Sequence, residues 1–300
     1  MREESKSHLG IAYLYTTIAA IFAIVTYLQL LFYNPIDKYY MKAFVLLFGT
    51  YAAIWFVLFK LNKKRNQSLS TIFKDCTARK TMGVILLKSG LISSFLYIPS
   101  SINAVSLIIK DEIDLSVIPS IICVLLFICQ ILLGLYLLKC KLKTDEMCKS
   151  ESVIGIAFLY TFITFIFSLV EKLSQAIISC NSLDEYFLLR FATYVTILLV
   201  LYILNKKQSQ SFVAIFNNNT IRKATGVLVL IEGLISLSIK INSVIDTIWL
   251  RGIIRDDVLH FVQSITLSIV GFIIIAIQIL LGIYLLRSNK EKTAKHNIAE

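Results

Sequence analysis

Long apolar runs separated by short polar segments dominate the pattern along this chain of 300 residues. A helix that crosses the roughly 30 Å core of a bilayer needs about 20 predominantly apolar residues, and each run is long enough to supply one. The pattern therefore predicts an all-α integral membrane protein with about eight transmembrane helices. The expected spans are Leu9–Phe32, Ala43–Leu61, Met82–Ile109, Leu115–Leu138, Val153–Ile178, Phe187–Leu204, Gly226–Leu250 and Leu259–Leu286.

The third of these runs is less regular than the others. Its second part, residues 93–103, carries several serines and Pro99. Proline lacks the backbone N–H that an α-helix uses, and its ring collides with the preceding turn. We therefore expect a kink or an early exit from the membrane in this segment.

Two tandem copies of one unit are visible in the sequence. GIAYLYT at residues 10–16 returns as GIAFLYT at 155–161, and QILLGLYLL at 130–138 returns as QILLGIYLL at 278–286. Internal repeats of this kind indicate that one structural unit has been duplicated. We expect each copy to contribute four of the eight helices.

Between these motifs, residues 48–93 align without a gap with residues 191–236, and 24 of the 46 positions are identical. Four spans is an even number, so both copies enter the membrane in the same direction. This predicts parallel repeats related by a pseudo-two-fold axis along the membrane normal. The expected organisation is a first four-helix repeat at 1–138, a cytoplasmic linker at 139–151, a second four-helix repeat at 152–287 and a cytoplasmic tail at 288–300.

The composition agrees with a membrane protein and argues against a soluble domain. Apolar residues make up 57% of the chain and charged residues 16%, against about 25% charged in soluble proteins. The net charge of +11 is spread over short clusters between the apolar runs, and the chain carries no recognisable nucleic-acid-binding module. Nucleic acid is therefore not an expected partner.

The basic clusters determine the expected orientation. Lys and Arg collect after the second, fourth, sixth and eighth runs, whereas the opposite connections are acidic. Positive charge marks the cytoplasmic side of a membrane protein, so we expect a multi-pass protein of the cell membrane with both termini cytoplasmic. Anionic lipid is an expected partner of the basic loops. The acidic residues of the opposite side are Asp111, Glu112, Asp114, Asp184, Glu185, Asp256 and Asp257.

The cytoplasmic connection between the second and third spans of each copy carries an apolar stripe with helical spacing. In the first copy it contains Phe73, and in the second copy Phe216. We expect a short amphipathic helix at the headgroup level, with Thr77 and Thr220 as N-caps of the spans that follow. The segment is either an interfacial elbow or a docking surface for anionic lipid or a partner protein.

Four polar side chains lie inside the expected spans at one depth: Lys88, Glu232, Gln130 and Gln278. Each is eight or nine residues from a basic residue at the cytoplasmic edge, about 12–14 Å at 1.5 Å per residue. Charged groups in a bilayer are costly and usually face the bundle interior or a wet cavity. Two interpretations stay open for the charged residues. Either Lys88 and Glu232 form an ion pair across the repeats, or Lys88 extends to the cytoplasmic interface and Glu232 makes a structural hydrogen bond.

Gly83 and Gly90 recur as Gly226 and Gly233, two turns apart on one helix face. Small residues at this spacing let transmembrane helices approach closely, so we expect them at helix contacts.

No catalytic residues, cofactor or metal site are predicted, and an enzyme is not expected. The chain lacks a P-loop, an HExxH motif, a nucleophile elbow and any CxxC pair. Two function classes stay open. The first is a small transporter or permease for an unknown solute, with Lys88, Glu232, Gln130 and Gln278 forming a polar site between the repeats. The second is a non-catalytic membrane subunit or self-protection (immunity-like) protein that acts by binding another membrane component, such as a membrane protein partner. A hollow centre favours the first, and a dry, packed centre favours the second.

Overall fold

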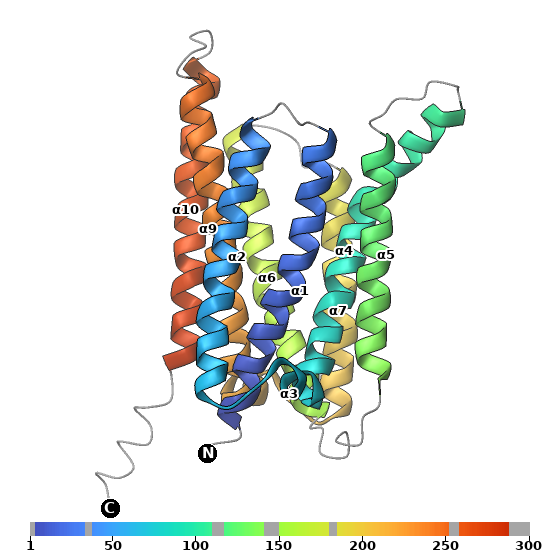
Figure 1. The fold of residues 1–300 in the computed structure, drawn as a ribbon, viewed down its shortest axis with the longest axis vertical. Helices are drawn as coiled ribbons and strands as arrows, with labels where there is room; N and C mark the ends of the chain where they lie inside the picture. Colours follow the sequence, from blue (N-terminus) through green and yellow to red (C-terminus); the bar gives the residue numbers. More distant parts are fainter. Residues whose placement is uncertain are drawn as a thin grey trace, which may run out of the picture.

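The computed structural model describes residues 4–33, 38–109, 117–140, 150–179, 185–251 and 258–287. These residues form a bundle of long helices with two short helices at one end (Figure 1). Most of the expected linker at 139–151 (residues 141–149), the tail at 288–300 and most of the acidic connections lie outside the described residues. The helices are α1 (Glu4–Tyr33), α2 (Lys38–Lys64), α3 (Leu69–Lys74), α4 (Cys76–Ile109), α5 (Val117–Lys139), α6 (Ser150–Ser179), α7 (Glu185–Lys207), α8 (Phe212–Asn217), α9 (Asn219–Arg251) and α10 (Val258–Arg287).

The prediction of a multi-pass helical membrane protein is confirmed at this level. Within the described part of the chain, seven helices are long and apolar enough to cross a membrane: α1, α2, α5, α6, α7, α9 and α10. The expected third span belongs to α4, which has 34 residues and runs alongside these helices (Figure 1). Its first part carries three basic residues, Arg79, Lys80 and Lys88. It remains helical through Pro99, and its outer end leans away from the bundle.

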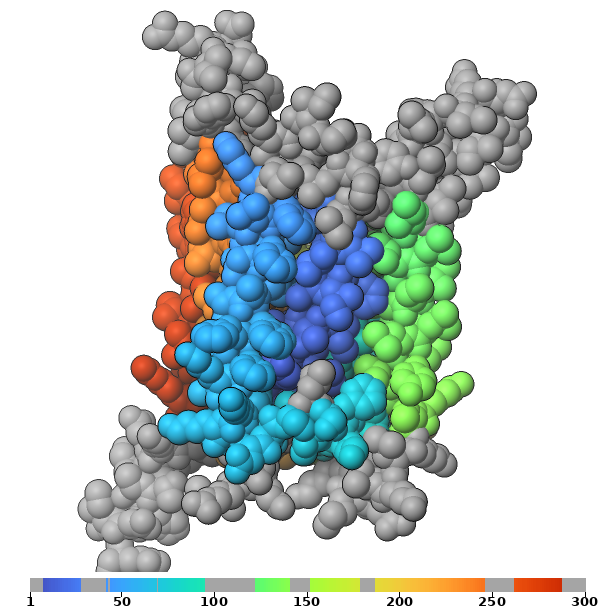
Figure 2. All heavy atoms as spheres, in the orientation of Figure 1, coloured from blue at the N-terminus to red at the C-terminus, as the bar shows by residue number. Residues whose placement is uncertain are grey.

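The two halves of the chain pack through corresponding helix pairs. α1 contacts α2, α4 and α9, whereas α6 contacts α7, α9 and α4. In addition α2 packs against α9, and α7 packs against α4. The first two long helices of each half therefore contact the third long helix of the other half. Figure 2 shows one face of this arrangement, with α1 seated between α2 and α5 and with α3 across its lower end.

Both short helices of the inner connections are present. Ser68 caps α3 by accepting a hydrogen bond from the Thr71 backbone N–H at 3.2 Å, and Ser211 caps α8 in the same way. The turns before them place Asn66 and Ser209 at φ of 56° and 57°, in the left-handed region that Asn tolerates better than most residues.

The expected N-caps of α4 and α9 were wrong by two residues. The Asp75 carboxylate accepts hydrogen bonds from the backbone N–H groups of Thr77 and Ala78, at 2.9 and 3.3 Å. Asn218 does the same at the start of α9. Both helices therefore begin earlier than predicted, because the short polar side chain just before the first turn already satisfies its free N–H groups.

The predicted close approach at the glycines is present where α4 meets α5 and where α9 meets α10. A Cβ at Gly83 would lie 2.9 Å from the Gly134 carbonyl oxygen, and one at Gly226 would lie 3.0 Å from that of Gly282. Next to these contacts, the fully buried Arg79 donates to the Cys140 carbonyl at the end of α5, at 3.1 Å. The guanidinium thereby satisfies a carbonyl that the helix end leaves free.

Candidate functional site

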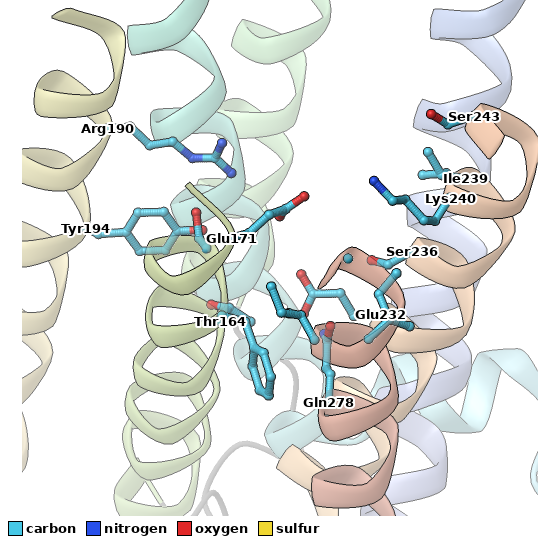
Figure 3. A pocket seen from close by; sticks show the side chains of 15 residues that line it. Thr164, Glu171, Arg190, Tyr194, Glu232, Ser236, Ile239, Lys240, Ser243 and Gln278 are labelled. Carbon is cyan, nitrogen blue, oxygen red and sulfur yellow. The ribbon is translucent and has the colours of Figure 1, made fainter. Parts of the chain in front are cut away.

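A cavity of about 430 Å³ lies within the second half of the chain, among α6, α7, α9 and α10 (Figure 3). Its lining follows α9 from Glu232 to Ser243 and α10 from Gln278 back to Gly271. On each of these helices the lining residues run from the depth of Glu232 and Gln278 towards the end of the bundle that lies opposite to the start of α1. Eleven residues of helix measure roughly 16 Å, so the cavity is a long one.

Four charged side chains from three helices face this cavity. In Figure 3, Arg190 of α7 and Lys240 of α9 point into it from opposite walls, Glu171 of α6 extends between them, and Glu232 lies deeper. Gly271 makes the room that Lys240 occupies, since a Cβ there would lie 2.6 Å from the lysine Cε. The cavity thus presents two basic and two acidic groups at membrane depth.

A second cavity of about 210 Å³ lies between the halves, where α1 and α4 meet α6, α7 and α9. Lys88 and Tyr15 line it from the first half. Arg190, Tyr194 and Glu232 line both cavities, so these three residues form the wall between them.

Lys88 is buried, and its ammonium group contacts three side chains of the second half. The Nζ atom donates a 2.7 Å hydrogen bond to the hydroxyl of Thr164. It also lies 4.6 Å from the centre of the Tyr160 ring and 5.3 Å from that of Tyr194. Aromatic faces attract cations, and this attraction is stronger where water is excluded. The side chain therefore turns inward and does not extend to the interface.

Glu232 and Arg190 each have a buried polar atom that remains unpaired within the described protein. These atoms are Oε2 of Glu232 and Nε of Arg190. Tyr160 is a hydrogen-bonding neighbour of Glu232, and its hydroxyl lies 3.4 Å from that of Tyr15, its counterpart in the first half. Buried charged groups with free hydrogen-bonding capacity are costly, so they mark a site that water or a ligand can complete.

The structure brings three of the four predicted polar residues to the two cavities. Glu232 and Gln278 line the larger cavity, and Lys88 and Glu232 line the smaller one. Gln130, half-buried on α5, lines neither. The expected place between the halves matches the smaller cavity, whereas the larger one lies inside the second half.

Sequence reasoning missed two of the four charged residues of the larger cavity, Glu171 and Arg190. A signal was present in the repeat itself, because each of the four charged residues that line this cavity stands opposite an uncharged residue of the first copy. When the alignment of the two copies is extended in both directions, Glu171 stands opposite Thr26, Arg190 opposite Leu47, Glu232 opposite Ser89 and Lys240 opposite Tyr97. A charge that one copy keeps and the other lacks is not required by the shared fold, which makes it a candidate for function.

In the described ranges, no three His, Cys, Asp or Glu side chains come close enough together to hold a metal ion. The fold and the charged cavities define a multi-pass helical membrane protein with a polar interior site. No known protein family, curated protein or solved structure matches the chain.

Proposed function

We propose that this protein is a small transporter or permease that binds its solute in the larger cavity. The observation that carries the proposal is the cavity of about 430 Å³, lined at membrane depth by Glu171, Arg190, Glu232 and Lys240. Its volume falls in the range of small-molecule sites, about 300–1,000 Å³. Ionisable groups inside transmembrane segments are rare and commonly line substrate or ion pathways.

The proposed topology is a protein of the cell membrane with eight spans, arranged as two parallel four-helix repeats. Both termini lie on the cytoplasmic side. The corresponding helix contacts support it: α1 meets α9 as α6 meets α4, and α3 meets α4 as α8 meets α9. The ends of the helices that carry Lys63, Lys64, Lys206 and Lys207 lie on the side where α1 begins and α10 ends. This arrangement of charge agrees with the positive-inside rule.

The two ends of the bundle differ in packing. Near the proposed cytoplasmic end, the side chains of Ile11, Ile72, Ile156 and Ile221 are at most 1% exposed, and they belong to one apolar cluster. The larger cavity lies beyond this cluster, towards the other end. In the proposed transport cycle the structure corresponds to a state whose site faces away from the cytoplasm, and a second state opens the packed end.

The alternative is a non-catalytic subunit or self-protection protein that binds another membrane component through its outer faces. Such a protein needs no access to the cavity from both sides of the membrane. Ser236 lies on the wall of the cavity and is suited to test access. Leu228 lies two turns away on the same helix and is fully buried, so it supplies a matched control.

We would introduce Ser236→Cys and, separately, Leu228→Cys, and expose sealed vesicles of each orientation to a membrane-impermeant thiol reagent. Labelling is measured as the increase over the parent chain. A transporter is expected to label at Ser236→Cys from both sides, faster from the non-cytoplasmic side, and not to label at Leu228→Cys from the non-cytoplasmic side. Labelling from one side only, or from neither, would contradict transport and favour the partner-binding alternative.

A further inference from the structure

The charges of the larger cavity specify the chemistry of its ligand. We propose that the cavity binds a small zwitterion, a molecule with one carboxylate and one ammonium group, such as an amino acid. This inference rests on the proposed solute site and adds the substrate class to it.

The balance of charges excludes the simpler ligands. A purely anionic solute would be drawn to Arg190 and Lys240 but would face the carboxylates of Glu171 and Glu232 in the same space. A purely cationic solute would meet the reverse conflict. In a medium of low dielectric constant both conflicts are costly, because charges a few ångströms apart interact strongly there. A ligand with both charges can place each one beside its opposite.

The unpaired atoms point to the same class. Nε of Arg190 is a buried donor, and Oε2 of Glu232 is a buried acceptor, and neither has a partner within the described protein. A guanidinium group binds a carboxylate through parallel hydrogen bonds, and such charge-assisted bonds are stronger than neutral ones. A carboxylate in turn accepts readily from an ammonium group. One zwitterion satisfies both atoms at once.

The polar groups around Glu232 suit an ammonium group further. The hydroxyl of Ser236 and the side-chain amide of Gln278 line the same deep part of the cavity (Figure 3). Their oxygens are acceptors that an ammonium group with three N–H donors can use. From the wall opposite Arg190, Lys240 presents a second cation to a ligand carboxylate.

The test uses the full-length protein purified in detergent, with the thermal unfolding midpoint as the readout of binding. The probes are the twenty protein amino acids, β-alanine and 4-aminobutyrate, each added singly. Propionate, butyrate and propylamine serve as singly charged analogues of similar size. We expect at least one zwitterion to raise the midpoint in a saturable way, and the singly charged analogues to leave it unchanged at the same concentration.

The variants Arg190→Gln and Glu232→Gln are each expected to weaken the binding of that zwitterion by about tenfold or more, since each removes one charge-assisted contact. Arg190→Lys keeps the charge but loses the forked geometry, and should give an intermediate loss. Lys60→Gln removes a charge from the exposed part of α2, away from the cavity, and should bind as the parent does. The unfolding midpoint of each variant without ligand shows whether it is folded.

The proposal is overturned if no zwitterion raises the midpoint, if the singly charged analogues raise it equally, or if folded Arg190→Gln and Glu232→Gln variants bind as well as the parent. These results are separate from those on transport. Two-sided labelling at Ser236→Cys without zwitterion binding would reject the substrate class alone. Zwitterion binding with one-sided labelling would keep the site and reject transport.

Discussion

The Nζ atom of Lys88 on α4 donates a 2.7 Å hydrogen bond to the hydroxyl of Thr164 on α6, across the junction of the two halves. Thr164 in turn donates to the carbonyl of Thr161 in its own helix, at 3.1 Å. In the alignment of the two copies, Thr164 of the second copy stands opposite Ala19 of the first, and Lys88 of the first copy stands opposite Ile231 of the second. The contact can therefore form only once in this twofold-repeated sequence, which makes the junction asymmetric where it borders the cavities.

Replacing Thr164 by Val tests the energetic role of this contact. The change removes the acceptor from a buried ammonium group, and we expect a loss of about 1–3 kcal/mol of unfolding free energy. The measurement is thermal unfolding in detergent. Thr196→Val is the control, because Thr196 is exposed and bonds only to the Ala192 carbonyl of its own helix. An equal effect of both changes would show that the cross-half bond contributes nothing special.

The relation between Lys88 and Glu232 is tested by a double-mutant cycle with Lys88→Met and Glu232→Gln. Both residues line the smaller cavity and are opposite in charge. Removing one should leave the other uncompensated, so the double variant should lose less stability than the two single losses combined, by about 0.5–3 kcal/mol. A parallel cycle that combines Glu232→Gln with Lys60→Met should be additive. Additivity in the first cycle would show that the two charges do not interact.

The close contact between α4 and α5 predicts a large effect of Gly83→Ala. The new methyl group would lie 2.9 Å from both the Gly134 carbonyl oxygen and Leu138 Cγ, so the helices would have to separate. We expect a loss of about 1–3 kcal/mol in thermal unfolding. Gly49→Ala is a matched control, since nothing lies within 4 Å of a Cβ there. Equal midpoints for the two variants would contradict the packing.

The hydrogen bonds of Arg79 predict that removing its side chain destabilises the end of α5. Its guanidinium donates to the carbonyls of Phe73 and Cys140, which Arg79→Gln would leave without these donors. We expect a loss of about 1–3 kcal/mol and faster hydrogen exchange at the end of α5. Arg287→Gln, at the exposed last residue of α10, should change neither quantity. Unchanged exchange in Arg79→Gln would rule out this role.

The orientation is tested by single cysteines at Lys64 and Lys207, the last residues of α2 and α7. In sealed vesicles of known orientation, an impermeant thiol reagent should reach both from the cytoplasmic side, because basic helix ends stay on that side. Labelling of either from the opposite side would invert the topology.

Much of the fold could be read from the sequence because a bilayer imposes a simple requirement on the chain. Every backbone polar group in the membrane core must be paired within a helix, so apolar runs of the right length identify the spans directly. Phe73 and Phe216 marked the short helices for a similar reason, since an amphipathic stripe has a period of its own. The caps were misplaced because Asp75 and Thr77 are both suitable capping residues, and only the backbone geometry chooses between them.

The depth of Lys88, Glu232 and Gln278 was likewise determined by the sequence, because helical rise converts residue number into distance along the membrane normal. The direction in which each side chain faces around its helix was not, since it depends on how neighbouring helices pack. The tertiary structure alone separated Gln130 from the other three, turned Lys88 onto Thr164, and gathered Glu171, Arg190 and Lys240 around one cavity. Those contacts join residues far apart in the chain, and their geometry is decided by the packing of α4, α6, α7, α9 and α10 against one another.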